Sequence, residues 1–499
     1  MKKLLALVLA AVMLFTLMSF AAAEEEPFVL TVMLPQMEST YEFQYENNPV
    51  LKAIEEASGV RLDIRFVANS GYGDMTTLTL ADPSSMPMVM VVTGPRDSNI
   101  IQAARDGAFW DITDYVQDAE NYPMLAEGPE GIYNNISVDG RVYGIFRGRA
   151  YPRAGIYYRS DIAAQQGITK KPETIDELTE LAMALAKVSP DTYALNMCKY
   201  VAGTINVITV AMGAPQTWGI DENGDVYPAH KSPAYLEGLT WLRNLYAAGG
   251  INPDFMNIES GDWDKQERTG VCFMRFDCMD NGYRQQEWFE KNEGVTELIF
   301  DIIPGLKKAD GSITIWPQNP GFSGEIVICK PAVSEEDLPK VLKFLDWTNT
   351  PEGQTLISCG VEGVTYWMHS DGFRYTTPEN DESITAESTK PLNGSMNQLG
   401  TNVGGDKTPA LAQTDLRALY AQYNIDYAQY AVSDPCYPLI SETAVMYGAT
   451  LSQMLEDAAV QYIAGIIDED GLRAVWQQWA DEGGDMMTEE YNEAYHAAN

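Results

Sequence analysis

The chain has 499 residues, of which 71 are acidic and 33 are basic, so its formal net charge is −38. Hydrophobic residues make up 45% and aromatic residues 10%, which excludes a disordered polyanion because such chains are poor in both. Phosphate binding needs a basic surface, so the charge excludes nucleic acid as a partner and disfavours anionic membranes.

The N-terminus has the pattern of a secretory signal peptide, which we predict at residues 1–23. Lys2 and Lys3 are followed by an apolar run up to about Phe20 and then by three alanines that suit cleavage. The alternative is an N-terminal membrane anchor, since the run is nearly long enough to span. No later stretch of about 18 apolar residues occurs, so we expect an exported protein whose mature form is soluble.

The first part of the chain alternates strand and helix patterns. Residues 29–34 predict a strand, and residues 48–58 predict a helix with Asn48 as its N-cap and Gly59 as its stop. Residues 60–66 form the next predicted strand. A further helix and an apolar run at 88–92 continue the alternation, which predicts an α/β lobe built on a parallel sheet with helical crossovers.

A similar pattern starts again after residue 154. Residues 155–158 and 270–274 predict strands, and residues 174–187 predict a helix that opens with a capping box of Thr174 and Glu177. Further helices are predicted at 232–248, at 338–347 and over the tail from 441 to 480. With no Ser/Gly-rich linker visible, we expect two α/β lobes that the chain crosses between more than once.

The six cysteines are too few to form the framework of so long a chain. Cys272 and Cys278 are six residues apart, so a local disulfide between them is one alternative. Cysteine also packs as a small hydrophobe, and buried free thiols are the reading that we favour for all six.

Motifs for catalysis or metal binding are largely missing. None of the three histidines has a metal-ligand spacing, residues 321–324 fall one residue short of a nucleophile elbow, and residues 404–408 lack the spacing of a phosphate loop. Residues 221–225 have oxygen ligands at alternate positions, but the glycine position favours a hairpin turn over a calcium loop. We therefore predict no catalytic residue, no metal and no cofactor, although the many carboxylates leave a glycosidase acid/base pair open.

Several segments, taken in order, resemble the bacterial extracellular solute-binding protein family 1, the ligand receptors of carbohydrate ABC importers. The segments that carry the resemblance share the family's glycine, proline, aromatic and acidic positions, and they are residues 107–115, 157–174, 242–253, 344–353 and 360–366. The segment at 360–366 is similar to the pattern of the large oligosaccharide-binding subgroup, as is Gly483-Gly484-Asp485. Each motif is weak alone, but their order and spacing over residues 28 to 495 are specific.

The resemblance implies a periplasmic-binding-protein type II-like fold, with two doubly wound α/β lobes joined by a multi-crossover hinge. The expected first lobe comprises residues 27–150 and 317–370, and the second comprises residues 151–316 and 371–499. The implied function is capture of an oligosaccharide between the lobes and its delivery to the permease subunits of an ABC importer, by a monomer that performs no catalysis. Two alternatives stay open: a secreted glycoside hydrolase, and a receptor for a peptide or another polar solute.

The predicted location is extracellular, at the cell surface or periplasmic. Gram-positive members of the family are usually lipoproteins with a cysteine directly after the signal peptide. Residues 19–24 contain no such lipobox cysteine, which puts lipid anchoring in doubt.

Sugar sites combine aromatic platforms with carboxylates, amides and guanidiniums, and in doubly wound lobes these groups follow the carboxyl ends of strands. The residues that this rule selects are Tyr72, Asp277, Trp316, Asn319 and Trp367. For each aromatic side chain, ordinary packing is the alternative.

Three arginines within seven residues stand out in so acidic a chain. Alternate spacing in an extended segment would place Arg147, Arg149, Tyr151 and Arg153 on one face, in the stretch that resembles the family's inter-lobe crossover. One reading is surface pairing with the many carboxylates. The sharper hypothesis is that one or two of these arginines bind an acidic sugar, such as a uronate-containing oligosaccharide.

Overall fold

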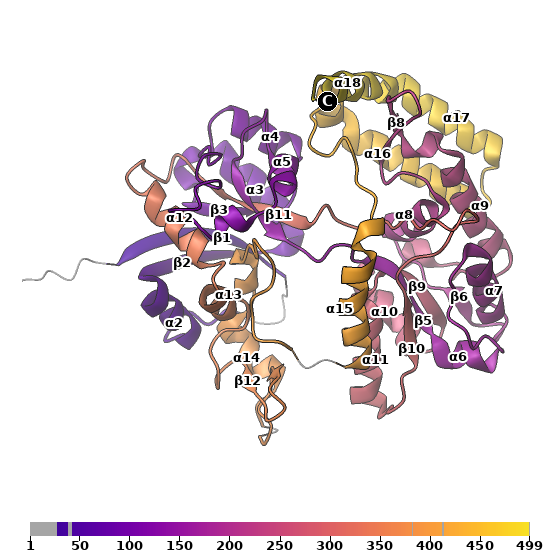
Figure 1. Cartoon of the computed structure of the whole chain (residues 1–499), viewed down its shortest axis with the longest axis horizontal. Coiled ribbons are helices and arrows are strands. Elements are labelled where there is room, and N and C mark those ends of the chain that lie inside the picture. The colour runs from indigo at the N-terminus through magenta and orange to yellow at the C-terminus, as the bar shows by residue number, and fades with distance from the viewer. Residues whose placement is uncertain (1–26, 38–41, 382, 412–413, 499) are drawn as a thin grey trace, which may run out of the picture.

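The computed structural model describes residues 27–37, 42–381, 383–411 and 414–498, and the chain forms two lobes that lie side by side (Figure 1). The predicted signal peptide at residues 1–23 lies outside the described residues. Within the described ranges, no helix combines the length and hydropathy that crossing a bilayer needs.

The first lobe is built on a five-stranded sheet with the order β2-β1-β3-β11-β4. β1 pairs in parallel with β2 and β3, as predicted, whereas β11 is antiparallel to both β3 and β4. β11 reverses the direction because the chain enters it on its way back from the second lobe, so the sheet is mixed rather than wholly parallel. The strands are β1 (Phe28–Gln36), β2 (Val60–Ala68), β3 (Val89–Val92), β4 (Gly144–Gly148) and β11 (Phe322–Ile328).

Helix boundaries follow the capping signals of the sequence. Helix α2 (Pro49–Ser58) begins where Asn48 Oδ1 accepts hydrogen bonds from the backbone N–H groups of Val50 (2.8 Å) and Leu51 (3.1 Å). It ends at Gly59, whose φ of 71° lies in the left-handed region that favours glycine. The predicted helix boundaries are confirmed here.

The capping box predicted for helix α7 (Ile175–Leu185) forms only in part. Thr174 Oγ1 accepts a hydrogen bond from the Glu177 N–H at 3.2 Å, as predicted. The carboxylate of Glu177 accepts from the N–H of Glu173 at 2.7 Å, one residue before the expected partner.

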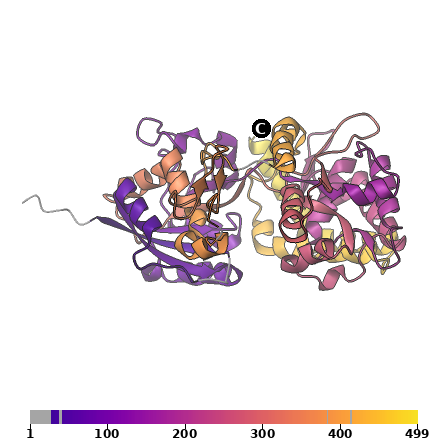
Figure 2. The ribbon, with the colours of Figure 1, turned by 90° about the horizontal axis from the view of Figure 1, so that it is seen from below.

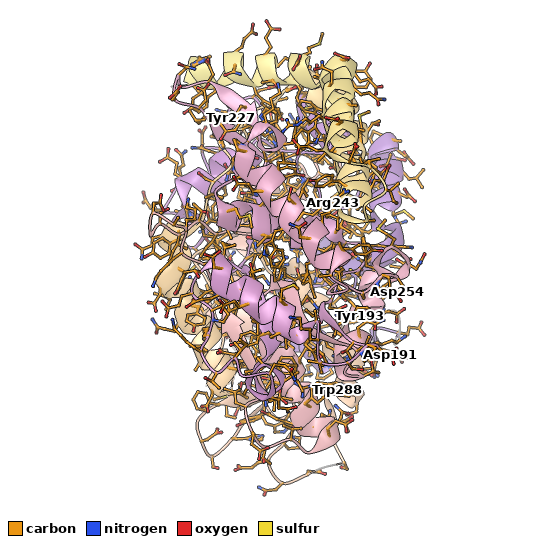
Figure 3. The ribbon with its side chains drawn as sticks, turned by 90° about the vertical axis from the view of Figure 1, so that its right-hand side faces the viewer. Asp191, Tyr193, Tyr227, Arg243, Asp254 and Trp288 are labelled. Carbon is orange, nitrogen blue, oxygen red and sulfur yellow. The ribbon has the colours of Figure 1, made fainter. Side chains whose placement is uncertain are left out.

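The second lobe holds a four-stranded sheet with the order β10-β5-β9-β6. β5 is antiparallel to β10 and β9, and β6 is parallel to β9. Figure 3 shows this lobe from the side away from the first lobe, with Arg243 of α9 and Trp288 of α11 labelled on helices that cover it. The strands and main helices are β5 (Ala154–Arg159), β6 (Tyr193–Leu195), β9 (Cys272–Cys278), β10 (Phe300–Ile303), α8 (Val201–Met212), α9 (Pro233–Ala247), α11 (Asp280–Glu293), α15 (Asp415–Tyr427), α16 (Glu442–Ile463), α17 (Glu469–Trp479) and α18 (Asp485–Ala498).

All six cysteines are buried free thiols, which confirms that prediction. Cys272 and Cys278 stand at the two ends of β9, so the strand between them holds them apart. The alternative of a local disulfide is wrong, because an extended seven-residue strand separates the two Cα atoms far beyond disulfide reach.

Part of the predicted division between the lobes is wrong. We expected residues 371–499 in the second lobe, but Met396, Leu399 and Val403 are each 0% exposed within the core of the first lobe. Val403 is held there by its backbone N–H, which donates to Asn349 Oδ1 at 2.8 Å. Hydrophobic burial therefore keeps residues 396–403 with the first sheet before the chain reaches α15.

Other first-lobe helices are α3 (Tyr72–Ala81), α4 (Ser98–Arg105), α5 (Glu130–Ile136), α12 (Leu338–Trp347), α13 (Pro351–Ser358) and α14 (Ala386–Asn393).

The segments that connect the lobes lie beside one another. The backbone N–H of Arg149 donates to the Gly321 carbonyl at 2.9 Å, and the backbone N–H of Arg153 donates to the Pro317 carbonyl at 3.2 Å. Residues 148–153 therefore run along residues 317–321. Residues 432–440, which join α15 to α16 of the second lobe, also reach this junction, since the Leu439 carbonyl accepts from Arg96 at 2.7 Å. The view from below shows the two lobes as separate bodies (Figure 2). The hinge thus brings together segments far apart in sequence.

Candidate functional site

Two cavities meet at the junction of the lobes. The larger, of about 810 Å³, is lined by the first lobe and by the start of the crossover. The smaller, of about 310 Å³, is lined from both sides, by Asn135 of the first lobe and by Gln216 and Asp434 beyond the hinge. Both cavities share Ile132, Arg149 and Gly321 in their walls. A solute held at this junction would contact both lobes.

The sequence predicted that the three arginines of the crossover share one face. In the structure they do not, because their side chains have different partners. Arg147 is 3% exposed and donates to Gln398 Oε1 at 2.6 Å and to the Ser323 carbonyl at 3.3 Å, both in the first lobe. Arg153 instead makes two 2.9 Å hydrogen bonds to the carboxylate of Asp280 in α11 of the second lobe. β4 ends at Gly148, so strand alternation stops before the other two arginines.

Arg149 lies between them and lines both cavities. Its side chain donates to the carbonyl of Gly148 at 3.0 Å. Tyr151 lines the smaller cavity. These two residues are the predicted site residues that the structure places in cavity walls at the hinge.

The positive charges of the crossover disfavour one another. Burial, followed by repulsion from Arg149, lowers the pKa of Arg147 to about 9. Burial and then repulsion from Arg153 lower the pKa of Arg149. For Arg153, burial opposes the charge, but the hydrogen bonds and proximity of Asp280 outweigh burial and raise its pKa. Of the three cations, Arg153 alone is compensated by a carboxylate among the described residues.

Two of the predicted aromatic platforms are core residues, so these predictions are wrong. Tyr72 is 1% exposed, and its hydroxyl lies 3.0 Å from the Met33 carbonyl oxygen and 2.9 Å from that of Val91. It follows a strand end, but it opens α3 beneath the sheet. Trp316 is 6% exposed in the core of the second lobe and borders a cavity of only about 20 Å³.

The other predicted residues lie near the hinge or in the first lobe. Asp277 is buried on β9 and accepts a 2.9 Å hydrogen bond from Asn281, and burial raises its pKa. Asn319 joins two connections, since its Nδ2 donates to the Ala150 carbonyl at 3.3 Å and its Oδ1 accepts from the Gly321 N–H at 2.9 Å. Trp367 is half-buried in β12 (Trp367–Met368), which pairs with β13 (Arg374–Tyr375). Their role toward a ligand stays a prediction.

Sequence reasoning missed the wall of the larger cavity formed by residues 397–408. This segment supplies the amides of Asn397, Gln398 and Asn402, and the neighbouring Arg374 adds a second guanidinium. The signal in the sequence is the polar, glycine-rich run at 397–408, of which only residues 404–408 were compared with a phosphate loop. Glycine is needed at 404 because φ is +74° and an added Cβ would come within 2.2 Å of Glu127 Oε2.

The described residues contain no group of three His, Cys, Asp or Glu side chains that could hold a metal ion. Residues 221–225 form the turn between β7 (Trp218–Ile220) and β8 (Val226–Pro228). Asp221 Oδ1 accepts from the backbone N–H groups of Asn223 (2.8 Å) and Asp225 (2.9 Å), which confirms the hairpin turn.

Comparison with known proteins gives relatives that match almost the whole chain. No protein-family model matches it. The chain is 29% identical over 468 residues to Lipoprotein LipO of Bacillus subtilis strain 168, covering 91% of this chain and 90% of the relative. It is 26% identical over 477 residues to the polygalacturonan/rhamnogalacturonan-binding protein YtcQ of the same organism, and the match covers 94% of this chain and 92% of YtcQ.

A similar solved structure is the crystal structure of the alginate-binding protein AlgQ2 without calcium ion. It aligns with a TM-score of 0.68 and 18% identity over 95% of this chain and 98% of that one. The chain has the periplasmic-binding-protein type fold of solute-binding proteins. The predicted fold class is therefore confirmed. Solute-binding proteins of this architecture close their lobes about a hinge, and the two cavities described above lie at that hinge.

Proposed function

We propose that this chain is an exported solute-binding protein that captures an oligosaccharide between its lobes and delivers it to an ABC importer. The observation that carries the proposal is the pair of cavities that meet at Arg149, at the junction of two lobes with a solute-binding-protein fold. A solute that contacts both lobes stabilises the closed arrangement by its greater affinity for it. The names of YtcQ and AlgQ2 refer to polysaccharides, which supports a carbohydrate ligand.

The size and lining of the larger cavity suit an oligosaccharide. Its volume of about 810 Å³ lies in the upper part of the range for small-molecule sites. Amides and guanidiniums line it together with Phe146, Pro129 and Ile132, so it combines hydrogen-bonding groups with apolar surface. That combination fits sugars, which present hydroxyl rims and apolar faces.

The same cavity argues against a glycoside hydrolase. Its lining carboxylates are Glu127 and Asp406. Glu127 forms an ion pair with Lys407 at 2.6 Å, and Asp406 accepts the backbone N–H of Thr408 at 2.9 Å. A glycosidase needs two carboxyl groups placed on either side of the scissile bond and free to act on it. Here one carboxylate is occupied by Lys407 and the other by the turn of its own loop. We therefore propose that the protein binds without catalysis, as a partner of permease subunits.

The test is a thermal-shift and calorimetry screen of the purified mature chain, covering neutral oligosaccharides, acidic oligosaccharides and short peptides, with chromatography of each sugar after overnight incubation. We expect a raised melting temperature and saturable binding with at least one oligosaccharide, which is recovered intact. Shorter products would identify a hydrolase instead. Binding of peptides alone would contradict the carbohydrate ligand.

A further inference from the structure

The side chain of Arg149 has fewer hydrogen-bond acceptors than those of Arg96 and Arg147, which also lack a carboxylate partner. Arg96 donates to two carbonyl oxygens, those of Ser137 and Leu439, each at 2.7 Å. Arg147 likewise has two acceptors, Ser323 and Gln398. The side chain of Arg149 has one acceptor in the described part of the chain, the carbonyl of the residue before it. Most of its hydrogen-bonding capacity therefore remains available at the cavity wall.

A second guanidinium lines the same cavity. Arg374 donates from Nε to the Pro409 carbonyl at 3.0 Å, and among the described residues its terminal nitrogens have no acceptor. Of the two lining carboxylates, Glu127 is neutralised by Lys407, which leaves Asp406 against two arginines. The larger cavity is thus locally cationic in a chain whose net charge is −38. Charges farther away than about 8 Å are largely screened at physiological ionic strength, so this local excess decides which solutes are favoured.

We infer that Arg149 is the specificity-determining residue for a carboxylate on the ligand, and that the ligand is an oligosaccharide containing a uronic acid. The inference rests on the proposed function and names the class of sugar. A guanidinium offers two parallel N–H donors that match the two oxygens of a carboxylate, so its planar fork selects an acidic sugar over its neutral counterpart.

The position of Arg149 on the crossover links this recognition to closure. The residue lies in the walls of both the first-lobe cavity and the cavity lined by Gln216 and Asp434. A carboxylate bound there also neutralises a charge that Arg147 and Arg153 repel. Binding an acid at this point therefore favours the arrangement in which both lobes contact the ligand.

The experiment measures the affinity of the mature protein for trigalacturonate and for its methyl ester by calorimetry, in the wild type and in R149Q, R149K and R473Q. The ester keeps the sugar rings and removes the charge. R473Q is the matched control, because Arg473 is an exposed arginine on α17 paired with Glu469 and its replacement changes the net charge equally.

We expect the wild type and R473Q to bind the acid about 10- to 100-fold more tightly than the ester. In R149Q this ratio should fall to within about threefold, because the affinity for the acid falls much more than the affinity for the ester, and R149K should lie between. Equal wild-type affinities for acid and ester would overturn the inference while leaving the proposed function intact. An unchanged ratio in R149Q would overturn the role of Arg149, and binding of neither trisaccharide would overturn the uronate ligand. The proposed function itself fails if the whole oligosaccharide panel fails to bind or if the bound sugar is cleaved. If R149Q does not fold, the wild-type ratio and R149K still decide the matter.

Discussion

The guanidinium of Arg147 donates a 2.6 Å hydrogen bond to Oε1 of Gln398, across 251 positions of the chain. Arg147 stands near the end of β4, where the chain leaves the first lobe, and Gln398 belongs to the wall of the larger cavity. Arg147 is almost completely buried, and its Nε has no partner among the described residues. This hydrogen bond therefore joins the start of the hinge to the wall of the candidate site. The buried guanidinium that makes it has few other acceptors.

The first prediction concerns this bond. Gln398→Ala removes an acceptor from a buried guanidinium, so we expect the free energy of unfolding to fall by about 2 kcal/mol in urea denaturation. The control is Gln453→Ala, because Gln453 is exposed and bonds Asp457 on the surface of α16, and we expect a change within about 0.5 kcal/mol. Equal losses in the two variants would show that the bond to Arg147 does not contribute.

The second prediction tests the placement of Tyr72 in the core. Tyr72→Phe keeps the ring but removes the hydroxyl group. That hydroxyl lies between the carbonyl oxygens of Met33 on β1 and Val91 on β3, and so links two neighbouring strands. We expect a loss of about 1–2 kcal/mol in the free energy of unfolding and no change in ligand affinity. Tyr375→Phe, whose hydroxyl bonds Asp371 on an exposed turn, should leave both quantities unchanged. Weaker binding by the Tyr72 variant at unchanged stability would return Tyr72 to the site.

Local patterns in the sequence predicted what depends on local physics. Asn48 and Gly59 bound α2 as expected, because capping bonds and a left-handed terminus involve neighbouring residues. The antiparallel β11 was not predictable in this way, since its direction is set by where the chain crosses between lobes. The same holds for residues 396–403: Met396 and Leu399 lie in a 3₁₀ helix of only four residues, and so short a segment does not indicate which lobe it packs against.

The candidate site was partly predictable for a similar reason. The contrast between the arginines at 147–153 and the acidic composition directed attention to the crossover, where the structure places Arg149 and Tyr151 in cavity walls. Which of the three remains available at a cavity depends on distant partners, Gln398 for Arg147 and Asp280 for Arg153. The rule that site residues follow strand ends failed for Tyr72 and Trp316, because it says nothing about the side of the sheet toward which a side chain packs.

A third prediction concerns the ion pairs that anchor the crossover to the second lobe. The Asp280 carboxylate is 4% exposed and contacts both Arg153 (2.9 Å) and Arg284 (2.7 Å). Asp280→Asn leaves Arg153 without its counter-charge in a largely buried setting, so we expect a loss of about 3 kcal/mol in the free energy of unfolding. Asp262→Asn removes an exposed carboxylate that pairs with Lys265 at 2.6 Å and should cost less than about 1 kcal/mol. Similar costs for both would show that burial adds nothing to the Asp280 pairs.

The last prediction uses Glu325, a carboxyl group on β11 that is 3% exposed. Its Oε2 has no hydrogen-bond partner within the described ranges. Burial raises its pKa to about 8, and the positive charge of Arg96 opposes this shift only in part. The folded chain therefore holds a proton on Glu325 that the unfolded chain releases at the ordinary carboxyl pKa.

The sign of the pH dependence follows from this difference. Between the ordinary glutamate pKa and pH 8 the folded state binds more protons than the unfolded state, so the contribution of Glu325 to stability declines as pH rises through that window. A shift of this size corresponds to at most about 5 kcal/mol. Glu325→Gln resembles the protonated side chain at every pH, so we expect the variant to match the wild type at pH 5 and to exceed its free energy of unfolding at pH 8.5.

Urea unfolding of both proteins at the two pH values checks this expectation. Asp434, whose pKa burial raises to about 6, adds a decline of its own at lower pH. That decline is common to both proteins, and the difference between wild type and variant isolates Glu325. A difference that is the same at pH 5 and pH 8.5 would show that Glu325 is ionised in the folded chain across the whole range, with Arg96 as a sufficient counter-charge.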